Sequence, residues 1–232
     1  MFRNGTLSIG FIGLWDAISV LINRRIQGAD DLQSLYPVAK SIVDCMRECT
    51  DNFTQETHLN FSLLASAAEG VAGCFADYDY LYTSNHLLKG IASKGYYSNS
   101  FHVPVDVSIS SYEKIALESE FHSVCNGGCI TYVEFSEMPA SNTEAILDMV
   151  DYAFEKGCNY FGINFPLDNC TTCGHISRIG EACPRCGGHD IKRLRRVSGY
   201  LAEFDWFTPG KYKEMLQRIG HDRINSYSSG EL

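Results

Sequence analysis

Four cysteines set the strongest constraint on how this chain can fold. They form two Cys-x-x-Cys pairs, Cys170 with Cys173 and Cys183 with Cys186, and nine residues separate the pairs. A Cys-x-x-Cys turn presents two sulfur atoms on one side of a tight loop, and four thiolates satisfy zinc in closed structural sites. The surrounding residues 168–190 lack apolar periodicity, and zinc binding stabilises such modules by roughly 10 kcal/mol. The spacing therefore predicts a structural Zn2+ site on these four cysteines, with an iron–sulfur cluster as the lesser alternative.

Two histidines lie close to these cysteines in the sequence. We expect His175 and His189 to be solvated neighbours of the metal rather than ligands, because four sulfur atoms already complete a tetrahedral zinc site. A basic run, residues 192–196, follows the cysteines directly. A zinc ribbon that binds nucleic acid through Arg193, Arg195 and Arg196 is therefore an alternative.

The rest of the chain has the composition of a globular protein with a core. Of its 232 residues, 45% are hydrophobic and 20% are charged. The 19 basic and 28 acidic residues give a net charge of −9. Affinity for a phosphate backbone comes from clustered lysines and arginines, so this balance argues against a protein whose whole surface follows a phosphate backbone.

Neither a secretory signal nor a membrane span is expected. The chain opens without the charged segment, apolar stretch and cleavage site of a signal peptide. Its most apolar early segment, residues 7–22, contains Asp16 and is too short to cross a bilayer. Ten cysteines in such a chain indicate metal or redox use rather than a disulfide framework. We therefore expect a cytoplasmic, reducing location.

Strands and helices alternate in the predicted order of elements. The apolar patterns predict helices over 30–57, 68–81, 111–124, 142–156 and 209–220, and strands over 4–14, 58–66, 101–108, 130–135 and 160–165. The first strand is expected to be buried, with glycines where another backbone approaches closely. Pro104 should place 101–108 at a sheet edge or strand end. This alternation is typical of parallel sheets and α/β barrels.

A glycine after the cysteines belongs to a longer set of motifs. Residues 195–201 read RRVSGYL, and five further segments occur along the chain: GTLSIGFIGL, NFSLLASAAEG, YYSNSFHVPV, NGGCITYVEF and YFGINFPLDNC. With the cysteine cluster, these segments resemble the anaerobic (class III) ribonucleoside-triphosphate reductases over nearly the whole chain. Two positions depart from the family pattern. Residues 67–70 read AAEG where a proline and then a serine are frequent, and Cys74 stands where an arginine is common.

The resemblance implies an α/β fold, part of a ten-stranded barrel of the glycyl radical enzyme type. Residues 1–167 would be the C-terminal part of the barrel, 168–190 the four-cysteine zinc module, and 191–232 the glycyl radical loop and C-terminal helix. It also implies a radical stored on Gly199, since a planar Cα radical has no room for a Cβ. An ordinary turn is the alternative for this glycine. Phe204, Trp206 and Phe207 would pack the loop against the barrel.

The family chemistry implies several partners. An activase, a radical S-adenosylmethionine protein with a [4Fe–4S] cluster, would remove a hydrogen atom from Gly199. A cysteine thiyl would then attack the ribonucleoside triphosphate, with formate or a thiol system as electron donor. Glu69 is the candidate substrate-pocket carboxylate, and a solvated glutamate at a helix N-terminus is an equal alternative.

The thiyl cysteine itself is expected upstream of this chain. The six remaining cysteines lie outside the matching context, and we expect each to be a small buried residue: Cys45, Cys49, Cys74, Cys125, Cys129 and Cys158. The chain is therefore interpreted as a C-terminal portion that needs the missing N-terminal half for turnover and forms a homodimer in the full enzyme. A genuine short protein, acting as a spare glycyl-radical part that docks on a parent reductase, is the alternative.

Overall fold

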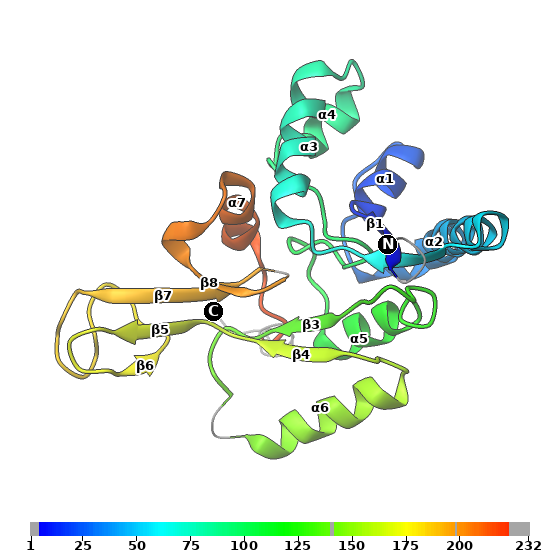
Figure 1. Ribbon diagram of the computed structural model, residues 1–232. Coiled ribbons are helices and arrows are strands. Elements are labelled where there is room, and N and C mark those ends of the chain that lie inside the picture. The colour runs from blue at the N-terminus through cyan, green and yellow to red at the C-terminus, as the bar shows by residue number, and fades with distance from the viewer. Residues whose placement is uncertain (1–4, 140–141, 198, 223–232) are drawn as a thin grey trace.

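The computed structural model describes residues 5–139, 142–197 and 199–222. The predicted domains also include residues that lie outside the described ones: 1–4, 140–141, 198 and 223–232. Two parallel strand pairs, one antiparallel sheet and the helices around them form an α/β fold (Figure 1). The described residues do not show a closed barrel, because the two parallel pairs are separate sheets.

The first parallel pair joins β1 (Thr6–Phe11) to β2 (Asn60–Ala65), with Thr6 opposite Asn60 and Phe11 opposite Ala65. The connection between them contains α1 (Leu14–Leu21) and the long α2 (Ala29–Thr57). Apolar residues recur along α2 at helical spacing, and its Leu32, Ala39 and Val43 side chains are fully buried.

The main core lies where α1 and α2 meet this strand pair and the turns after it. Trp15, Ile18, Leu63, Phe101 and Phe121 are fully buried in it. The expected burial of the first strand is wrong in the described chain, because most of β1 is exposed and Ile9 keeps 38% of its surface.

Two helices follow β2 and extend away from the β1–β2 pair in Figure 1: α3 (Glu69–Tyr82) and α4 (His86–Ala92). The side chain of Asn85 caps α4 by accepting hydrogen bonds from the backbone N–H groups of Leu87 and Leu88. The short helices α1 and α4 were not among the predicted elements.

The expected strand over 101–108 is wrong. These residues form turns and irregular backbone, and the apolar alternation reflects the burial of Phe101, Val103 and Val107 in the main core. Helix α5 (Ser111–Ser119) follows, and a capping box between Ser110 and Glu113 fixes its start. It ends five residues earlier than expected, and turns carry the chain on to residue 124.

The second parallel pair joins β3 (Thr131–Glu134) to β4 (Phe161–Asn164), with α6 (Thr143–Glu155) as the connection. In Figure 1, α6 lies along one side of this pair. A second small core, which includes Ile115, Val133 and Met149, fills the space between the helices and the pair. The predicted strands and helix in this region are confirmed with shorter ends.

An antiparallel sheet of order β6–β5–β7–β8 extends from the end of β4. It consists of β5 (Leu167–Cys170), β6 (Ile176–Ser177), β7 (Ile191–Arg196) and β8 (Leu201–Glu203). A 3-10 helix, η2 (Phe204–Trp206), leads to α7 (Pro209–Gln217), which Thr208 caps. This sheet was not predicted, because its strands are short and polar. None of the described helices is both long and apolar enough to cross a membrane.

Candidate functional site

Gly199 lies at the tip of the hairpin between β7 and β8. The last pair of this ladder is Arg196 with Leu201, so the chain turns within four residues. The Gly199 N–H donates a hydrogen bond to Oε1 of Glu69 over 2.7 Å, across 130 positions of sequence. A Cβ at position 199 would lie 3.2 Å from the Cβ of Ala67, so any residue other than glycine requires a small shift of its neighbour. Gly199 itself is exposed in this chain.

Glu69 is the first residue of α3, and its side chain is only 7% exposed. Its Oε2 lies 2.6 Å from Nζ of Lys211, which α7 contributes and which is 3% exposed. The ammonium group of Lys211 also lies over the rings of Tyr200 and Phe207, 4.1 and 4.4 Å from their centroids. A solvated Glu69 is therefore wrong: the carboxylate is buried, paired with a cation and bonded to Gly199.

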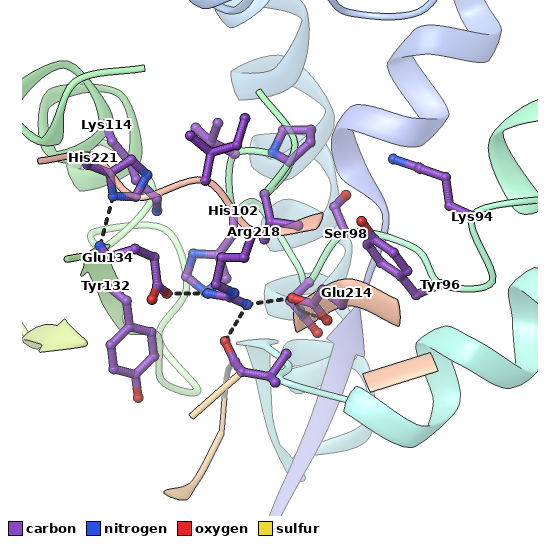
Figure 2. Close-up of a pocket in the computed structure, with 16 residues that line it drawn as sticks. Lys94, Tyr96, Ser98, His102, Lys114, Tyr132, Glu134, Glu214, Arg218 and His221 are labelled. Carbon is purple, nitrogen blue, oxygen red and sulfur yellow. Dashed lines mark hydrogen bonds and ion pairs between the residues drawn. The ribbon is translucent and has the colours of Figure 1, made fainter. Parts of the chain in front are cut away.

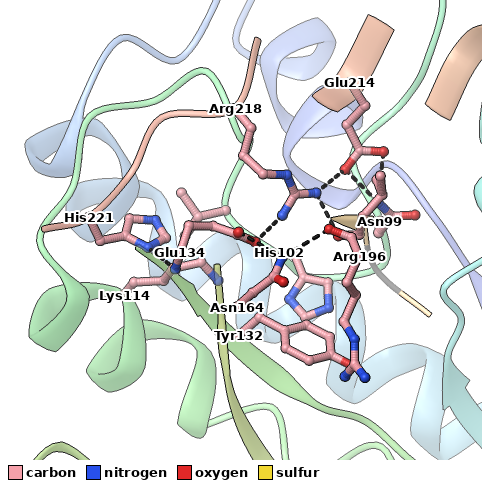
Figure 3. A network of polar contacts seen from close by, with 12 residues as sticks. Asn99, His102, Lys114, Tyr132, Glu134, Asn164, Arg196, Glu214, Arg218 and His221 are labelled. Carbon is pink, nitrogen blue, oxygen red and sulfur yellow. Dashed lines mark hydrogen bonds and ion pairs between the residues drawn. The ribbon is translucent and has the colours of Figure 1, made fainter. Parts of the chain in front are cut away.

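A second charged group holds the other side of the same loop. Arg218 donates from Nη2 to the carbonyl oxygen of Val197 over 2.6 Å and to Oε1 of Glu214 over 2.7 Å. Its Nη1 bonds the carboxylate of Glu134, at the end of β3. Asn99 adds a hydrogen bond from Nδ2 to Glu214 over 3.1 Å. Figure 3 shows the guanidinium group of Arg218 between the two carboxylates.

Burial shifts the acid–base properties of this network. Desolvation raises the pKa of Glu214, because Arg218 and Asn99 offset only part of its cost and the Glu69 and Glu134 carboxylates add to it. The network therefore pairs three carboxylates, those of Glu69, Glu134 and Glu214, with two cations, Lys211 and Arg218. All five side chains are largely buried.

Arg218 lines two cavities. The smaller one, drawn in Figure 2, also touches Tyr96 and His102, has a volume of about 30 Å³ and holds little more than one water molecule. The larger cleft, of about 430 Å³, opens at the carboxyl ends of β3 and β4 and is lined in part by Arg178 and Arg196. Of these two, the larger one has the size of a small-molecule site.

The four predicted metal ligands converge at the far end of the antiparallel sheet. All four Sγ atoms lie within 4.8 Å of one another. The Sγ atoms of Cys170 and Cys186 are 3.6 Å apart, as are those of Cys173 and Cys183. Tetrahedral zinc with bonds of about 2.3 Å places its sulfur atoms about 3.8 Å apart, so the donor set and its spacing fit zinc.

The two cysteine pairs sit on equivalent turns. Gly174 donates its N–H to the carbonyl of Cys170 over 2.8 Å, and Gly187 does the same to Cys183 over 2.9 Å. Both glycines have a positive φ, 70° and 73°, which residues with a Cβ rarely adopt. Burial raises the pKa of the Cys170 thiol, but backbone N–H donors and the neighbouring thiols outweigh it and lower the pKa to about 6. The first turn therefore favours the thiolate at Cys170, whereas at Cys186 the Gly188 N–H lowers the pKa but the neighbouring thiols outweigh it and raise the pKa to about 12.

The neighbouring histidines have other partners. Nε2 of His175 lies 3.0 Å from the Ser177 hydroxyl, and Nδ1 of His189 lies 3.0 Å from the carbonyl of Glu181. This arrangement agrees with the expectation that neither imidazole is needed as a ligand.

The basic run after the cysteines is used inside the molecule. The carboxylate of Asp168 is fully buried, and it pairs with Arg193 over 3.3 Å and with Arg195 over 2.5 Å. It also accepts the backbone N–H of Ile179 over 2.8 Å. Arg196 donates to the Tyr132 hydroxyl over 3.0 Å. These contacts tie the metal module to β5 and β7, and they weaken the nucleic-acid alternative.

The other six cysteines differ in their burial. The expected burial is wrong for Cys45, Cys49 and Cys74, which are exposed, and it holds for Cys125 and Cys158. Cys129 is half-buried. Burial raises the pKa values of the thiols within the core: to about 12 for Cys125, and to about 11 for Cys129 and Cys158. These three are therefore protonated thiols at neutral pH.

The aromatic residues after the hairpin follow the expectation only in part. Phe204 packs against Phe207 and Tyr212, with ring centroids 5.6 and 4.9 Å apart. Trp206 remains 80% exposed, so its expected packing role is wrong for this chain.

Sequence comparison identifies the family. The family profile described as anaerobic ribonucleoside-triphosphate reductase matches residues 1–221. The chain is 33% identical to the anaerobic ribonucleoside-triphosphate reductase of Escherichia coli (strain K12), with 95% of this chain and 32% of the relative covered. It is also 33% identical to the protein of the same name from Enterobacteria phage T4, with 95% and 36% covered. The chain belongs to the anaerobic ribonucleoside-triphosphate reductase family.

Solved structures of anaerobic ribonucleotide reductases share the fold. One aligns with a TM-score of 0.74 at 23% identity and covers 94% of this chain and 34% of its own. The Thermotoga maritima protein with dATP bound in the specificity site aligns with a TM-score of 0.69, also at 23% identity, over 90% and 33%. The resemblance to this oxidoreductase family is therefore confirmed, and the chain spans about a third of the length of the relatives that it matches.

Two residues of the Gly199 network, Lys211 and Arg218, were assigned no role from the sequence. The signal available was their spacing with Glu214: positions 211, 214 and 218 share one face of a helix. Since the partners of all three lie far away in sequence, the spacing alone could not show what this face contacts.

Proposed function

We propose that this chain is the C-terminal part of an anaerobic ribonucleoside-triphosphate reductase and that Gly199 stores its radical. Residues 1–167 would complete a ten-stranded barrel with the missing N-terminal half, 168–190 form the zinc module, and 191–232 supply the radical loop and C-terminal helix. The observation that carries the proposal is the hairpin-tip glycine whose N–H is bonded to the buried Glu69 carboxylate.

Gly199 suits radical storage for a chemical reason. Removal of a hydrogen atom from its Cα leaves a planar centre that the adjoining amide groups delocalise, and no Cβ crowds it. A radical S-adenosylmethionine activase with a [4Fe–4S] cluster would remove that hydrogen atom. The exposure of Gly199 gives such a partner access, and the missing N-terminal half would enclose the loop for catalysis.

The substrate would be a ribonucleoside triphosphate, which the enzyme converts to the deoxyribonucleoside triphosphate. The 2′-hydroxyl leaves as water, and formate or a thiol system supplies two electrons. The thiyl cysteine would come from the missing half, in a full enzyme that is a homodimer. Glu69 is the proposed pocket carboxylate of this chain, because its bond to Gly199 places it beside the radical position.

Zinc has a structural role in this proposal. Cys170, Cys173, Cys183 and Cys186 would hold the ion and fix the far end of the sheet whose other end carries Gly199. The segment would otherwise depend on short strands and the buried ion pairs of Asp168.

An anaerobic radical assay tests the proposal. The chain is incubated with the activase, S-adenosylmethionine and a reductant, its EPR spectrum is recorded, and air is then admitted. We expect a glycyl doublet, followed by cleavage of the backbone at residue 199. Gly199→Ala is compared with the matched control Gly28→Ala, which changes a glycine outside the hairpin that has open space at its Cβ position. A doublet that survives Gly199→Ala contradicts the proposal.

A second candidate is a spare glycyl-radical part that docks on a damaged parent reductase. The exposed Gly199 favours it. Anaerobic addition of the activated chain to a parent enzyme cleaved at its own radical glycine separates the two: recovery of activity supports the spare part. Binding only to an enzyme fragment that lacks this portion supports the split enzyme.

A further inference from the structure

The hairpin tip is held at two backbone atoms that bracket the radical position. The carbonyl oxygen of Val197 accepts from Arg218 over 2.6 Å, and the N–H of Gly199 donates to Glu69 over 2.7 Å. Both contacts depend on the C-terminal helix region, because Lys211 pairs with Glu69 and Glu214 pairs with Arg218.

The face of α7 that reaches the hairpin is defined by helical spacing. Lys211 and Glu214 lie three positions apart on α7, so their side chains project from one side of the helix, and Arg218 directly follows its last residue. Thr208 caps this helix by accepting the N–H of Lys211, and Pro209 begins it. The start of α7, and with it Lys211, is therefore fixed by local sequence.

Two glycines bring α7 against α3, the helix that carries Glu69. A Cβ on Gly210 would lie 2.9 Å from Cα of Gly73 and 3.0 Å from the carbonyl oxygen of Gly95. A Cβ on Gly73 would lie 3.3 Å from Cα of Gly210. The two helices thus approach too closely for a Cβ at position 210, and this contact sets the distance from Lys211 to Glu69.

The charged side chains of this contact are largely shielded from solvent. The side chains of Lys211 and Glu214 are 3% exposed, that of Glu69 is 7% exposed and that of Arg218 is 14% exposed. Removing one partner from such a pair leaves an uncompensated buried charge, so each side chain holds the next one in place. Lys213 on the same helix is exposed, and its side chain lies against Gly95, outside these ion pairs.

We infer that α7 is a clamp that positions the radical loop, with Lys211 and Arg218 as its positioning residues. Lys211 orients the Glu69 carboxylate that accepts the hydrogen bond from the Gly199 N–H. Arg218 fixes the carbonyl of Val197, two residues before Gly199. Together they set the direction of the Gly199 Cα–H bonds. The inference rests on the proposed function of Gly199 for its catalytic meaning, but its geometry can be tested without a radical.

The first test measures the Gly199 amide in the unactivated full chain. The protein is labelled with 15N-glycine, and Gly199→Ala assigns the resonance. In Lys211→Met we expect the Gly199 proton to shift upfield and its hydrogen exchange to accelerate by about tenfold or more, as for the loss of a bond to a charged group. Lys211→Arg should restore the wild-type signal. Lys213→Met, the matched control two residues away, should leave it unchanged.

Arg218→Lys provides the second variant, because it keeps the charge but loses the planar fork that reaches Val197 and both carboxylates. We expect faster exchange at Gly199 here too. If Lys211→Met does not fold, the double change Glu69→Gln with Lys211→Met removes both buried charges and should give the same loss at Gly199.

The radical assay forms the second arm. We expect Lys211→Met and Arg218→Lys to give less glycyl radical per chain than Lys213→Met, at equal zinc content and circular dichroism. Wild-type levels of shift, exchange and radical in both clamp variants would overturn the inference. Absence of any radical in the wild type would overturn the proposed function instead, and the amide measurement would still decide whether the clamp exists.

Discussion

His221 is a buried residue whose environment keeps its ring neutral. Nδ1 of its ring accepts the backbone N–H of Glu134 over 2.8 Å, and its own backbone N–H donates to the Glu134 carbonyl over 2.8 Å. Burial, followed by the charge of Lys114, lowers the pKa of His221 to about 3. The neighbouring charges include Glu118 and Asp222, which raise the pKa, and Arg218, which lowers it. The neutral ring therefore fastens the segment after α7 to β3.

This neutral ring predicts acid sensitivity. The unfolded chain binds a proton on His221 below about pH 6.5, whereas the folded chain does not until about pH 3, so stability is lost as the pH falls through this interval. Between pH 7.5 and 5.5, we expect His221→Asn to lose about 1 kcal/mol less free energy of unfolding than the wild type. Urea titrations of both proteins at the two pH values measure this difference. Equal losses would show that His221 does not titrate in this way.

The sequence indicates candidate metal ligands and a candidate radical glycine, but it does not indicate the residues that position them. The four cysteines at Cys-x-x-Cys spacing follow from what zinc requires, whereas Gly199 is a candidate only through the family resemblance. Lys211 and Arg218 depend on contacts with Glu69 and Val197 that only the folded chain brings together. Glu69 could be named as a candidate, but its burial and its bond to Gly199 required the structure.

At the scale of elements, apolar pattern predicts what packing stabilises. The long α2 and the connection α6 agree with their predicted ranges, because each buries an apolar face. The sheet β5–β8 gave no such signal, since backbone ladders, Asp168 and the cysteine turns stabilise it. Residues 101–108 gave a false strand signal, because their apolar side chains fill the core from turns. Apolar pattern reports burial rather than regular structure. It therefore misses the polar sheet β5–β8 and falsely indicates a strand over residues 101–108.

Metal removal should separate this sheet from the helical core. We expect about one zinc per chain, and a chelator should increase amide exchange over residues 168–196 while α2 remains protected. Cys183→Ser should have the same effect, and Cys74→Ser, which changes an exposed cysteine, should have none. Hydrogen exchange with mass spectrometry measures both regions in one experiment. Uniform loosening of α2 and the sheet would contradict a local role for the ion.

The buried carboxylate of Asp168 provides a second test of this sheet. Asp168→Asn leaves Arg193 and Arg195 without their counter-charge. We expect a loss of about 3 kcal/mol, the lower end for buried pairs, because Arg193 is partly exposed. Urea unfolding gives the value. Asp190→Asn, at an exposed aspartate bonded to Thr171, is the matched control and should cost far less.

At the scale of the whole molecule, the chain exposes a strand and apolar side chains of the kind that protein cores usually bury. The β1 strand is mostly exposed, and α3 presents Val71, Phe75, Tyr78 and Tyr82 at helical spacing, each 46% to 72% exposed. The described strands form two separate parallel pairs, and the chain spans about a third of the length of its relatives. These exposed surfaces are where the missing part of the proposed barrel would pack.

We therefore predict that the activated chain alone yields no deoxyribonucleotide. Addition of the remaining two-thirds of a matching reductase should restore turnover, and it should fail with the Gly199→Ala chain. Anaerobic assays with a labelled ribonucleoside triphosphate measure the product. Turnover by the isolated chain would place the thiyl cysteine within it and contradict the proposed division.

The unequal burial of the two tryptophans gives the chain an internal optical probe. Trp15 is sealed in the main core, whereas Trp206 stands 80% exposed, seven positions beyond Gly199. The emission of Trp15 should stay constant while the fold persists, so a blue shift in the fluorescence of the unmodified chain would come from Trp206. Any molecule that covers this side of the hairpin can thus be followed in real time, without a label and before any radical is made.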